Sequence, residues 1–125
     1  MYDKQLVLEI LRNISASLLH IRKRFSPITS PNDFIKDDIG LEKLDSICMQ
    51  VTAIGEAFKQ IDKITNGKLF AKYPKVDWKK AMGMRDIIVH HYFDIDHEVV
   101  YHVCKDRMPE IEKTILLMIQ DLEAQ

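Results

Sequence analysis

The sequence contains few residues that interrupt, kink or cross-link a chain. Its 125 residues include only four glycines, four prolines and two cysteines. Cys48 and Cys104 lie far apart and form no Cys-x-x-Cys pair, the spacing typical of zinc sites. We therefore expect both cysteines to be core thiols in a reducing compartment, and not a disulfide or a metal site.

Long apolar runs and linkers are also absent. Runs such as residues 115–119 are far shorter than the roughly 20 residues that cross a bilayer, so we expect no membrane association. The first residues, MYDKQLVLEILRN, are charged and amphipathic and lack the features of a signal peptide, so we expect a cytoplasmic protein. Without an internal repeat or a Gly/Ser-rich stretch, residues 1–125 are predicted to form one domain.

Neither sign of charge dominates. The 18 lysines and arginines and the 19 aspartates and glutamates give a formal net charge of −1. No global positive field therefore attracts nucleic acid, and an anionic partner must be bound by a local patch.

What the sequence does contain is helical periodicity over two long segments. Apolar residues recur there at steps of three and four, which predicts amphipathic helices. The proline-containing stretch FSPITSPNDF separates them, and Asn66-Gly67 is a typical helix stop. The apolar positions are Val7, Ile10, Leu11, Ile14, Leu18, Ile21 and Phe25, then Leu44, Ile47, Cys48, Val51, Ile54, Phe58 and Ile61.

Shorter helices are expected after the second long one. Asp77 is a plausible N-cap for a third helix, Asp94 and Asp96 flank a turn and are expected to cap a fourth, and Pro109 suits the first turn of the last. The β-branched residues 87–89 resemble a strand, but no partner strand is recognisable, so we predict none. The prediction is an all-α bundle with two long antiparallel helices and shorter C-terminal helices.

The segment GMRDIIVHHY, residues 83–92, carries the polar groups most suited to chemistry. On a regular helix Arg85 and Tyr92 lie within about 20° of each other, whereas His90 is rotated by about 140° from Arg85. Convergence of Arg85 and His90 therefore requires a helix that ends near His90, a reaching arginine or a second subunit.

An arginine with a histidine suits phosphodiester chemistry. A guanidinium binds phosphate oxygens through paired hydrogen bonds, and a histidine exchanges protons near neutral pH. In RNA the 2′-hydroxyl supplies the nucleophile. An arginine and a histidine five residues apart also occur by chance in many helical proteins. From these residues alone, a surface arginine with a core histidine is therefore the favoured interpretation.

A wider resemblance bears on this choice. The string RDIIVHHY fits the Arg-x4-His-x-Tyr motif of the HepT-like branch of the HEPN superfamily. The surrounding stretch YPKVDWKKAMGMRDIIVHHYFDIDHEVVYHV is similar to the family's pattern, as are NDFIKDDIGLEKLDSICMQVTAIGEAF upstream and MPEIEKTI downstream. The resemblance covers nearly the whole chain in the family's order.

The resemblance implies a HEPN-like bundle acting as a toxin: a dimeric, metal-independent ribonuclease without a cofactor. Arg85 would bind the scissile phosphate and His90 would act as general acid or base. Asp86, where the family often has asparagine, and His91 would support them. Tyr92 would be the residue to which a minimal nucleotidyltransferase antitoxin transfers AMP, in a hetero-oligomer with the toxin.

Other interpretations remain open. His90, His91, Asp94, Asp96 and His97 could form a metal site, but no His pair at i, i+4 is present and we predict none. The chain could also be a non-catalytic HEPN module that binds nucleotide or RNA, or a helical partner of a nucleotidyltransferase.

Four residues before the motif also have predicted roles. Lys79 and Lys80 are expected to contribute to RNA binding, although such a charge run is usually a solvated face. We expect Trp78 to anchor the third helix, and we expect Gly83 to allow close approach of another helix, either within the chain or across a dimer.

Overall fold

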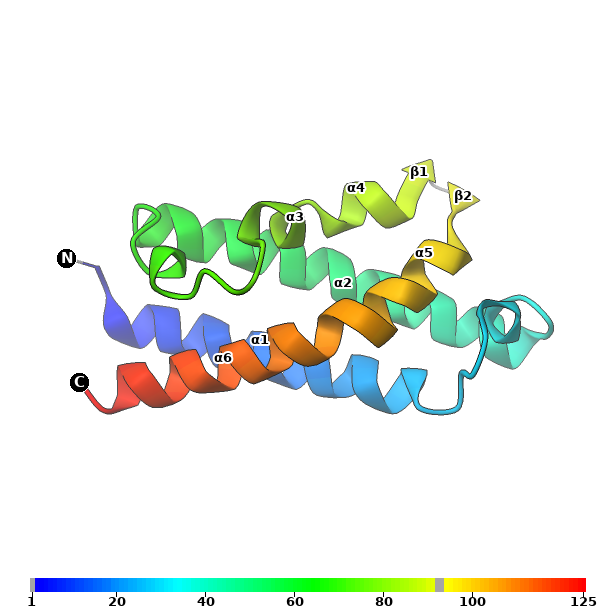
Figure 1. Ribbon diagram of the computed structural model, residues 1–125, viewed down its shortest axis with the longest axis horizontal. Helices are drawn as coiled ribbons and strands as arrows, with labels where there is room; N and C mark the ends of the chain where they lie inside the picture. The colour runs from blue at the N-terminus through cyan, green and yellow to red at the C-terminus, as the bar shows by residue number, and fades with distance from the viewer. Residues whose placement is uncertain (1, 92–93) are drawn as a thin grey trace.

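The computed structural model describes residues 2–91 and 94–125, and the side chains of all of these except residues 89–91. The helices α1 (Lys4–Phe25) and α2 (Asp38–Ile64) run antiparallel, with α6 (Met108–Glu123) packed along α1 (Figure 1). Both termini lie at the same end of this bundle. The all-α prediction with two long antiparallel helices is confirmed.

The remaining elements are short and cover α2 and one end of the bundle. The helices α3 and α4 pack on α2, and α5 packs on η1. Their bounds are η1 (Pro31–Phe34), η2 (Phe70–Lys72), α3 (Trp78–Met82), α4 (Met84–Ile88), β1 (Val89–His91), β2 (Asp94–Ile95), α5 (His97–His102) and the π-helical turn η3 (Val103–Arg107). Within the described residues, no helix is long and apolar enough to cross a membrane.

Local signals in the sequence set most of the helix ends. The side chain of Asp77 accepts a hydrogen bond from the Lys80 amide at 3.1 Å, which caps α3 as predicted. Helix α2 ends at Ile64, and Asn66 and Gly67 follow with φ of 54° and 75°, the left-handed backbone expected of this helix stop. Pro109 lies in the first turn of α6, also as predicted.

An aromatic cluster anchors α3 to the bundle. The Trp78 ring stacks on Phe70, with centroids 4.1 Å apart, and meets the ring of Phe58 edge-on at 5.4 Å. Its indole N–H donates to the Tyr73 carbonyl at 2.8 Å, which satisfies the polar atom of a ring that is only 8% exposed. The predicted anchoring role of Trp78 is confirmed.

Two glycines of α2 allow close contacts, whereas Gly83 does not. A Cβ at Gly40 would lie 2.0 Å from the Asp33 carbonyl oxygen of η1, and one at Gly55 would lie 3.3 Å from the Met82 oxygen of α3. A Cβ at Gly83 would meet only its own preceding turn, at 3.6 Å or more. Within the chain, Gly83 makes no close contact with another helix and instead ends α3, so a close approach at Gly83 stays a prediction for the dimer alone.

The two cysteines are buried, free thiols. Burial raises the pKa of Cys48 to about 12, and the same cause raises the pKa of Cys104 to about 12. A thiol with so high a pKa is protonated and unreactive at neutral pH. The prediction of core thiols is confirmed.

The segment after α4 corrects one prediction. Val89–His91 pairs antiparallel with Asp94–Ile95, so the β-branched run does lead into a strand, with a partner only a few residues away. The Asp96 amide also donates to the Ile88 carbonyl at 3.0 Å. Asp94 belongs to β2 and only Asp96 caps α5, through the Val99 amide at 3.1 Å, so the expectation that both aspartates are caps is half right.

Candidate active site

Arg85 lies on α4, a helix of five residues that is anchored in the core by two buried side chains. Met84 and Ile88 are 1% and 0% exposed, and burying two such side chains contributes roughly 1.5–3 kcal/mol each. The Arg85 side chain itself is 46% exposed. A short, well-anchored helix therefore presents a solvated guanidinium, which is the arrangement that binding of an anion requires.

The carboxylate next in sequence lies beside this guanidinium. Arg85 Nη1 and Asp86 Oδ1 are 3.3 Å apart, and the Asp86 side chain is 75% exposed. Between two exposed groups such a pair contributes little to stability, about 0–1 kcal/mol. The contact leaves Arg85 accessible and places a negative charge where a phosphate would approach.

The helix ends between the two catalytic candidates. Helix α4 stops at Ile88 and the backbone of His90 belongs to β1. The angle of about 140° expected between Arg85 and His90 on a regular helix therefore does not apply. One of the conditions for their convergence, a helix that ends near His90, is met.

The other motif residues lie at or beyond the limits of the described structure. The side chains of His90 and His91 and all of Tyr92 lie outside the described residues. Their proposed roles remain predictions from the sequence.

The flank of α4 opposite Arg85 borders a hollow of about 460 Å³. Side chains advance by about 100° per residue, so Ile87 and Arg85 lie about 160° apart around α4. Met84 and Ile87 line this hollow, together with residues of α5 and η3, and Arg85 does not. Arg85 therefore projects away from the hollow, toward solvent on the other side of α4.

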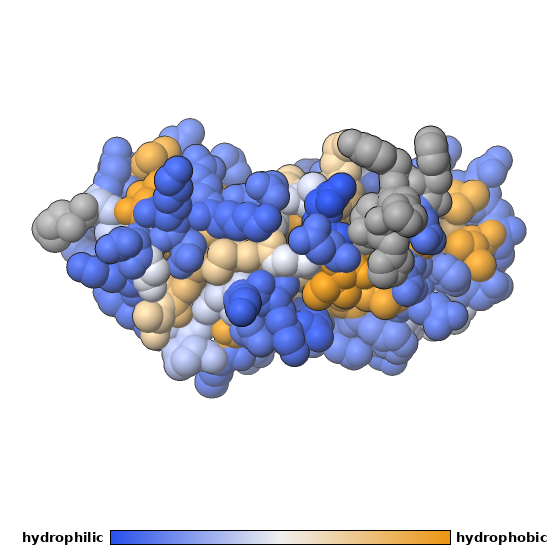
Figure 2. All heavy atoms as spheres, turned by 90° about the horizontal axis from the view of Figure 1, so that it is seen from above, coloured by the Kyte–Doolittle hydropathy of each residue, from blue (hydrophilic) through white to orange (hydrophobic). Residues whose placement is uncertain are grey.

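The lysines before the motif are solvent-exposed. Lys79 and Lys80 lie on α3, and both are exposed. Within the described residues, neither side chain forms an ion pair, so both charges are available to an anion. Figure 2 shows the molecule from the side of α3 and α4, with hydrophilic residues surrounding smaller hydrophobic areas.

The acidic candidates for a metal site have structural roles. The Asp96 carboxylate caps α5, and Asp94 is an exposed residue of β2. In the part of the chain that the structure describes, no three His, Cys, Asp or Glu side chains are grouped so that they could bind a metal ion.

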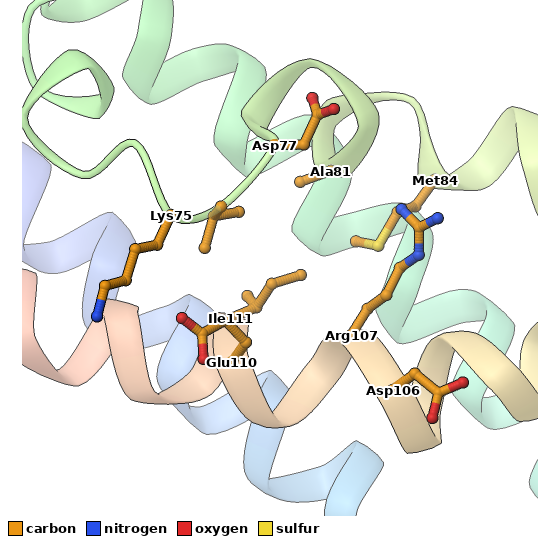
Figure 3. Close-up of a pocket in the computed structure, with 9 residues that line it drawn as sticks. Lys75, Asp77, Ala81, Met84, Asp106, Arg107, Glu110 and Ile111 are labelled. Atoms are coloured by element: carbon orange, nitrogen blue, oxygen red, sulfur yellow. The ribbon is translucent and has the colours of Figure 1, made fainter.

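Sequence reasoning missed Arg107, which projects toward Met84 from the opposite wall of a smaller hollow of about 160 Å³ (Figure 3). Arg107 is the last residue of the π-helical turn η3, and the Met108 amide donates to the Val103 carbonyl five residues back. The extra residue in that turn changes the direction of the side chains that follow. Nothing in the spacing of apolar residues indicates it.

Comparison with known proteins identifies related sequences. A protein-family model described as "Ribonuclease HepT-like" matches residues 14–118. Two proteins of Methanocaldococcus jannaschii, each named "Putative RNase", are 41% and 40% identical over 76 residues, 61% of this chain and 60% and 58% of their own lengths. A third, from Caldanaerobacter subterraneus subsp. tengcongensis and also named "Putative RNase", is 31% identical over 88 residues, 70% of this chain and 72% of its own length.

The matches to the two archaeal proteins thus span about three fifths of those relatives. No solved structure matches the chain significantly.

Proposed function

The chain belongs to the HepT-like ribonuclease family, and on that premise we propose that it is a metal-independent endoribonuclease whose chemistry is carried by Arg85 and His90. The observation that supports this most directly is the exposed Arg85 guanidinium on a helix that ends just before His90. The relatives named as RNases support RNA as the substrate.

The chemistry requires only these two side chains and the RNA. Arg85 holds the non-bridging oxygens of the scissile phosphate and stabilises the charge that develops on them. The 2′-oxygen attacks phosphorus and the bond to the 5′-oxygen breaks, which leaves a 2′,3′-cyclic phosphate and a 5′-hydroxyl. His90 takes the proton of the 2′-hydroxyl or supplies one to the departing 5′-oxygen, and solvent water carries out the other proton transfer.

Four nearby residues affect substrate binding in this proposal. Lys79 and Lys80 bind phosphates upstream or downstream of the cleavage site, consistent with their exposure on α3. His91 contacts the substrate beside His90. Asp86 tunes the affinity of Arg85 through the 3.3 Å contact.

The active form in this proposal is a homodimer in which the motifs of two subunits face one cleft. Arg85 projects away from the hollow on the other flank of α4, so a second subunit is the natural source of an opposite wall. Gel filtration with light scattering would measure the mass, and a strictly monomeric active enzyme would contradict the proposal.

The proposed biological role is that of a toxin neutralised by a minimal nucleotidyltransferase. That antitoxin transfers AMP to the Tyr92 hydroxyl, which adds bulk and negative charge beside an anion-binding site. Intact-mass spectrometry after co-expression would show the added AMP on wild type and not on Tyr92→Phe. An unmodified tyrosine in a fully neutralised protein would contradict this role.

Cleavage of RNA by purified protein, freed of any partner and treated with a chelator, tests the enzyme directly. We expect Arg85→Ala and His90→Ala to lose at least about 100-fold in rate. Arg12→Ala and His20→Ala are matched controls, because both residues are exposed and lie on α1. Equal activity of all four variants and wild type would reject the assignment.

A non-catalytic module that binds RNA or nucleotide is the second candidate. The acidic Asp86 beside Arg85 favours it, since a carboxylate at the phosphate site opposes the build-up of negative charge during cleavage. RNA binding that depends on Arg85 without any cleavage would support this candidate.

A further inference from the structure

Two neighbouring hollows lie on the flank of α4 opposite Arg85. The smaller, of about 160 Å³, lies between α3 and the start of α6, and the larger, of about 460 Å³, lies between α4 and α5 with η3. Met84, Asp106 and Arg107 line both hollows, so the two adjoin. We call the two hollows together the α4 groove. Figure 3 shows its smaller half, with Arg107 extended toward Met84.

The floor of the α4 groove is apolar. Met84 and Val103 are 1% and 5% exposed, Val99 is half-buried and Ile87 is 38% exposed at the rim. A partner that covers this floor removes hydrocarbon surface from water, which favours binding by about 25 cal/mol per Å². Folding has left the Ile87 side chain only partly covered.

The walls of the α4 groove are acidic. Among the described residues that line it, Lys75 and Arg107 are cationic, against five carboxylates, although the whole chain carries a net charge of only −1. The carboxylates are Asp77, Asp96, Glu98, Asp106 and Glu110. Such an excess of negative charge along one groove creates a local potential that attracts cations and repels phosphates.

Few of these carboxylates are neutralised within the described structure. Asp77 and Asp96 accept backbone amides as helix caps, which leaves their negative charge in place. Asp106 lies 3.5 Å from His102 Nδ1, with both side chains more than half exposed. Glu98 and Glu110 are exposed and form no ion pair with another described residue.

We propose that the α4 groove is a docking surface for a basic amphipathic helix of a partner protein. Such a helix would place apolar side chains on the floor formed by Met84, Ile87 and Val99, and lysines or arginines against the carboxylate walls. RNA is excluded from this groove by the same carboxylates, and its binding is confined to the Arg85 flank. A second copy of the chain fits poorly, because groove against groove would oppose like charges.

Synthetic peptides test this surface without knowledge of the natural partner. The probe is a helical peptide with leucines on one face and lysines on the other, and its counterpart carries glutamates in place of the lysines. We expect the lysine peptide to bind and to shift the NMR signals of the Met84, Val99 and Val103 methyl groups. We expect the glutamate peptide to bind at least tenfold more weakly.

Charge reversal in the α4 groove should invert this preference. The variant Glu98→Lys/Asp106→Lys should bind the lysine peptide about tenfold more weakly and the glutamate peptide more tightly than wild type does. The matched control, Glu9→Lys/Glu42→Lys, makes the same change of charge at exposed sites on α1 and α2. Circular dichroism melting would verify that both variants fold.

Three results would overturn the proposal. The first is a lysine peptide that does not bind wild type, or that shifts methyl signals away from the α4 groove. The second is an equal loss of affinity in the groove and control variants. The third is a charge-reversed variant that differs from wild type in self-association but binds both peptides as wild type does. That result would assign the groove to a second copy of the chain.

Discussion

The Arg85 guanidinium and the Asp86 carboxylate lie 3.3 Å apart on α4, although they are adjacent in sequence. Adjacent residues on a helix point about 100° apart, so this contact forms because the long arginine side chain bends back. The Arg85 side chain is 46% exposed and the Asp86 side chain is 75% exposed. A phosphate that binds Arg85 therefore competes with the Asp86 carboxylate for the guanidinium group.

Replacing Asp86 with asparagine should strengthen binding of RNA. Removing a weak, exposed ion pair and its repulsion of phosphate is worth up to about 1 kcal/mol, or roughly a two- to fivefold lower Kd at low salt. Fluorescence anisotropy with an RNA that has 2′-deoxy substitution at the cleavage site would measure this without turnover. Asp45→Asn, at an exposed site on α2, is the control. Identical gains in both variants would show that only net charge matters.

Gly40→Ala should destabilise the protein far more than Gly83→Ala. The new methyl group at position 40 would lie 2.0 Å from the Asp33 carbonyl oxygen, which must move away, whereas at position 83 the nearest atoms are at 3.6 Å. We expect a loss of about 1–3 kcal/mol or more for the first and a change within about 0.5 kcal/mol for the second. Urea unfolding would measure both, and equal midpoints would contradict the contact.

The thiols should react only when the protein unfolds. Burial raises the pKa of Cys48 and Cys104 to about 12, so at pH 8 almost no thiolate is present and neither sulfur is accessible. Labelling with Ellman's reagent should be slow in buffer and fast in denaturant, where two cysteine thiols per chain should react. Rapid labelling of either cysteine in the native protein would contradict its burial.

Asp33→Asn should reduce stability at neutral pH and have less effect in acid. The Asp33 carboxylate accepts the Thr29 amide at 2.8 Å and the Thr29 hydroxyl at 2.9 Å, and pairs with Lys36 at 3.0 Å. The Thr29 amide, first, and these other contacts lower the pKa of Asp33 well below its ordinary value of 3.8. Because the folded-state pKa is the lower one, the stabilisation is present above pH 3.8 and is lost as the pH falls below it.

The difference in Tm between wild type and Asp33→Asn should therefore shrink between pH 5 and pH 2. Glu9→Gln, which removes an exposed carboxylate from α1, serves as the control and should show no such trend. A difference in Tm that stays constant across this pH range would indicate that Asp33 stabilises the protein through the shape of its side chain and not through its charge.

Local sequence determined what could be predicted of the fold. Asp77, Asp96 and Pro109 act through hydrogen bonds and backbone angles within one helical turn, so their positions alone indicated where helices begin. The buried faces of α1 and α2 followed from periodicity for the same reason. The sequence motif also indicated Arg85, and the 46% exposure of its side chain is consistent with the expected binding of a phosphate.

Features that depend on contacts between distant segments could not be predicted. The roles of Gly40 and Gly55 arise from the approach of η1 and α3, which no local pattern encodes. The pairing of β1 with β2 was not predicted, because three strand-like residues are too few to indicate a partner strand. The α4 groove depends on walls from α3, α5, η3 and α6, so no single segment could suggest it.

The π-helical turn η3 has a consequence for comparing this chain with its relatives. The π-helical turn between α5 and α6 contains one residue more than a regular helical turn. The side chains before it are therefore rotated by about 100° around the helix axis relative to the side chains after it. A relative that lacks that residue would keep one straight helix here while turning the counterparts of Glu98 and His102 away from those of Arg107 and Glu110. One-residue gaps within positions 103–107 would thus divide the family into members with and without a matching groove, even where the Arg-x4-His-x-Tyr motif is unchanged.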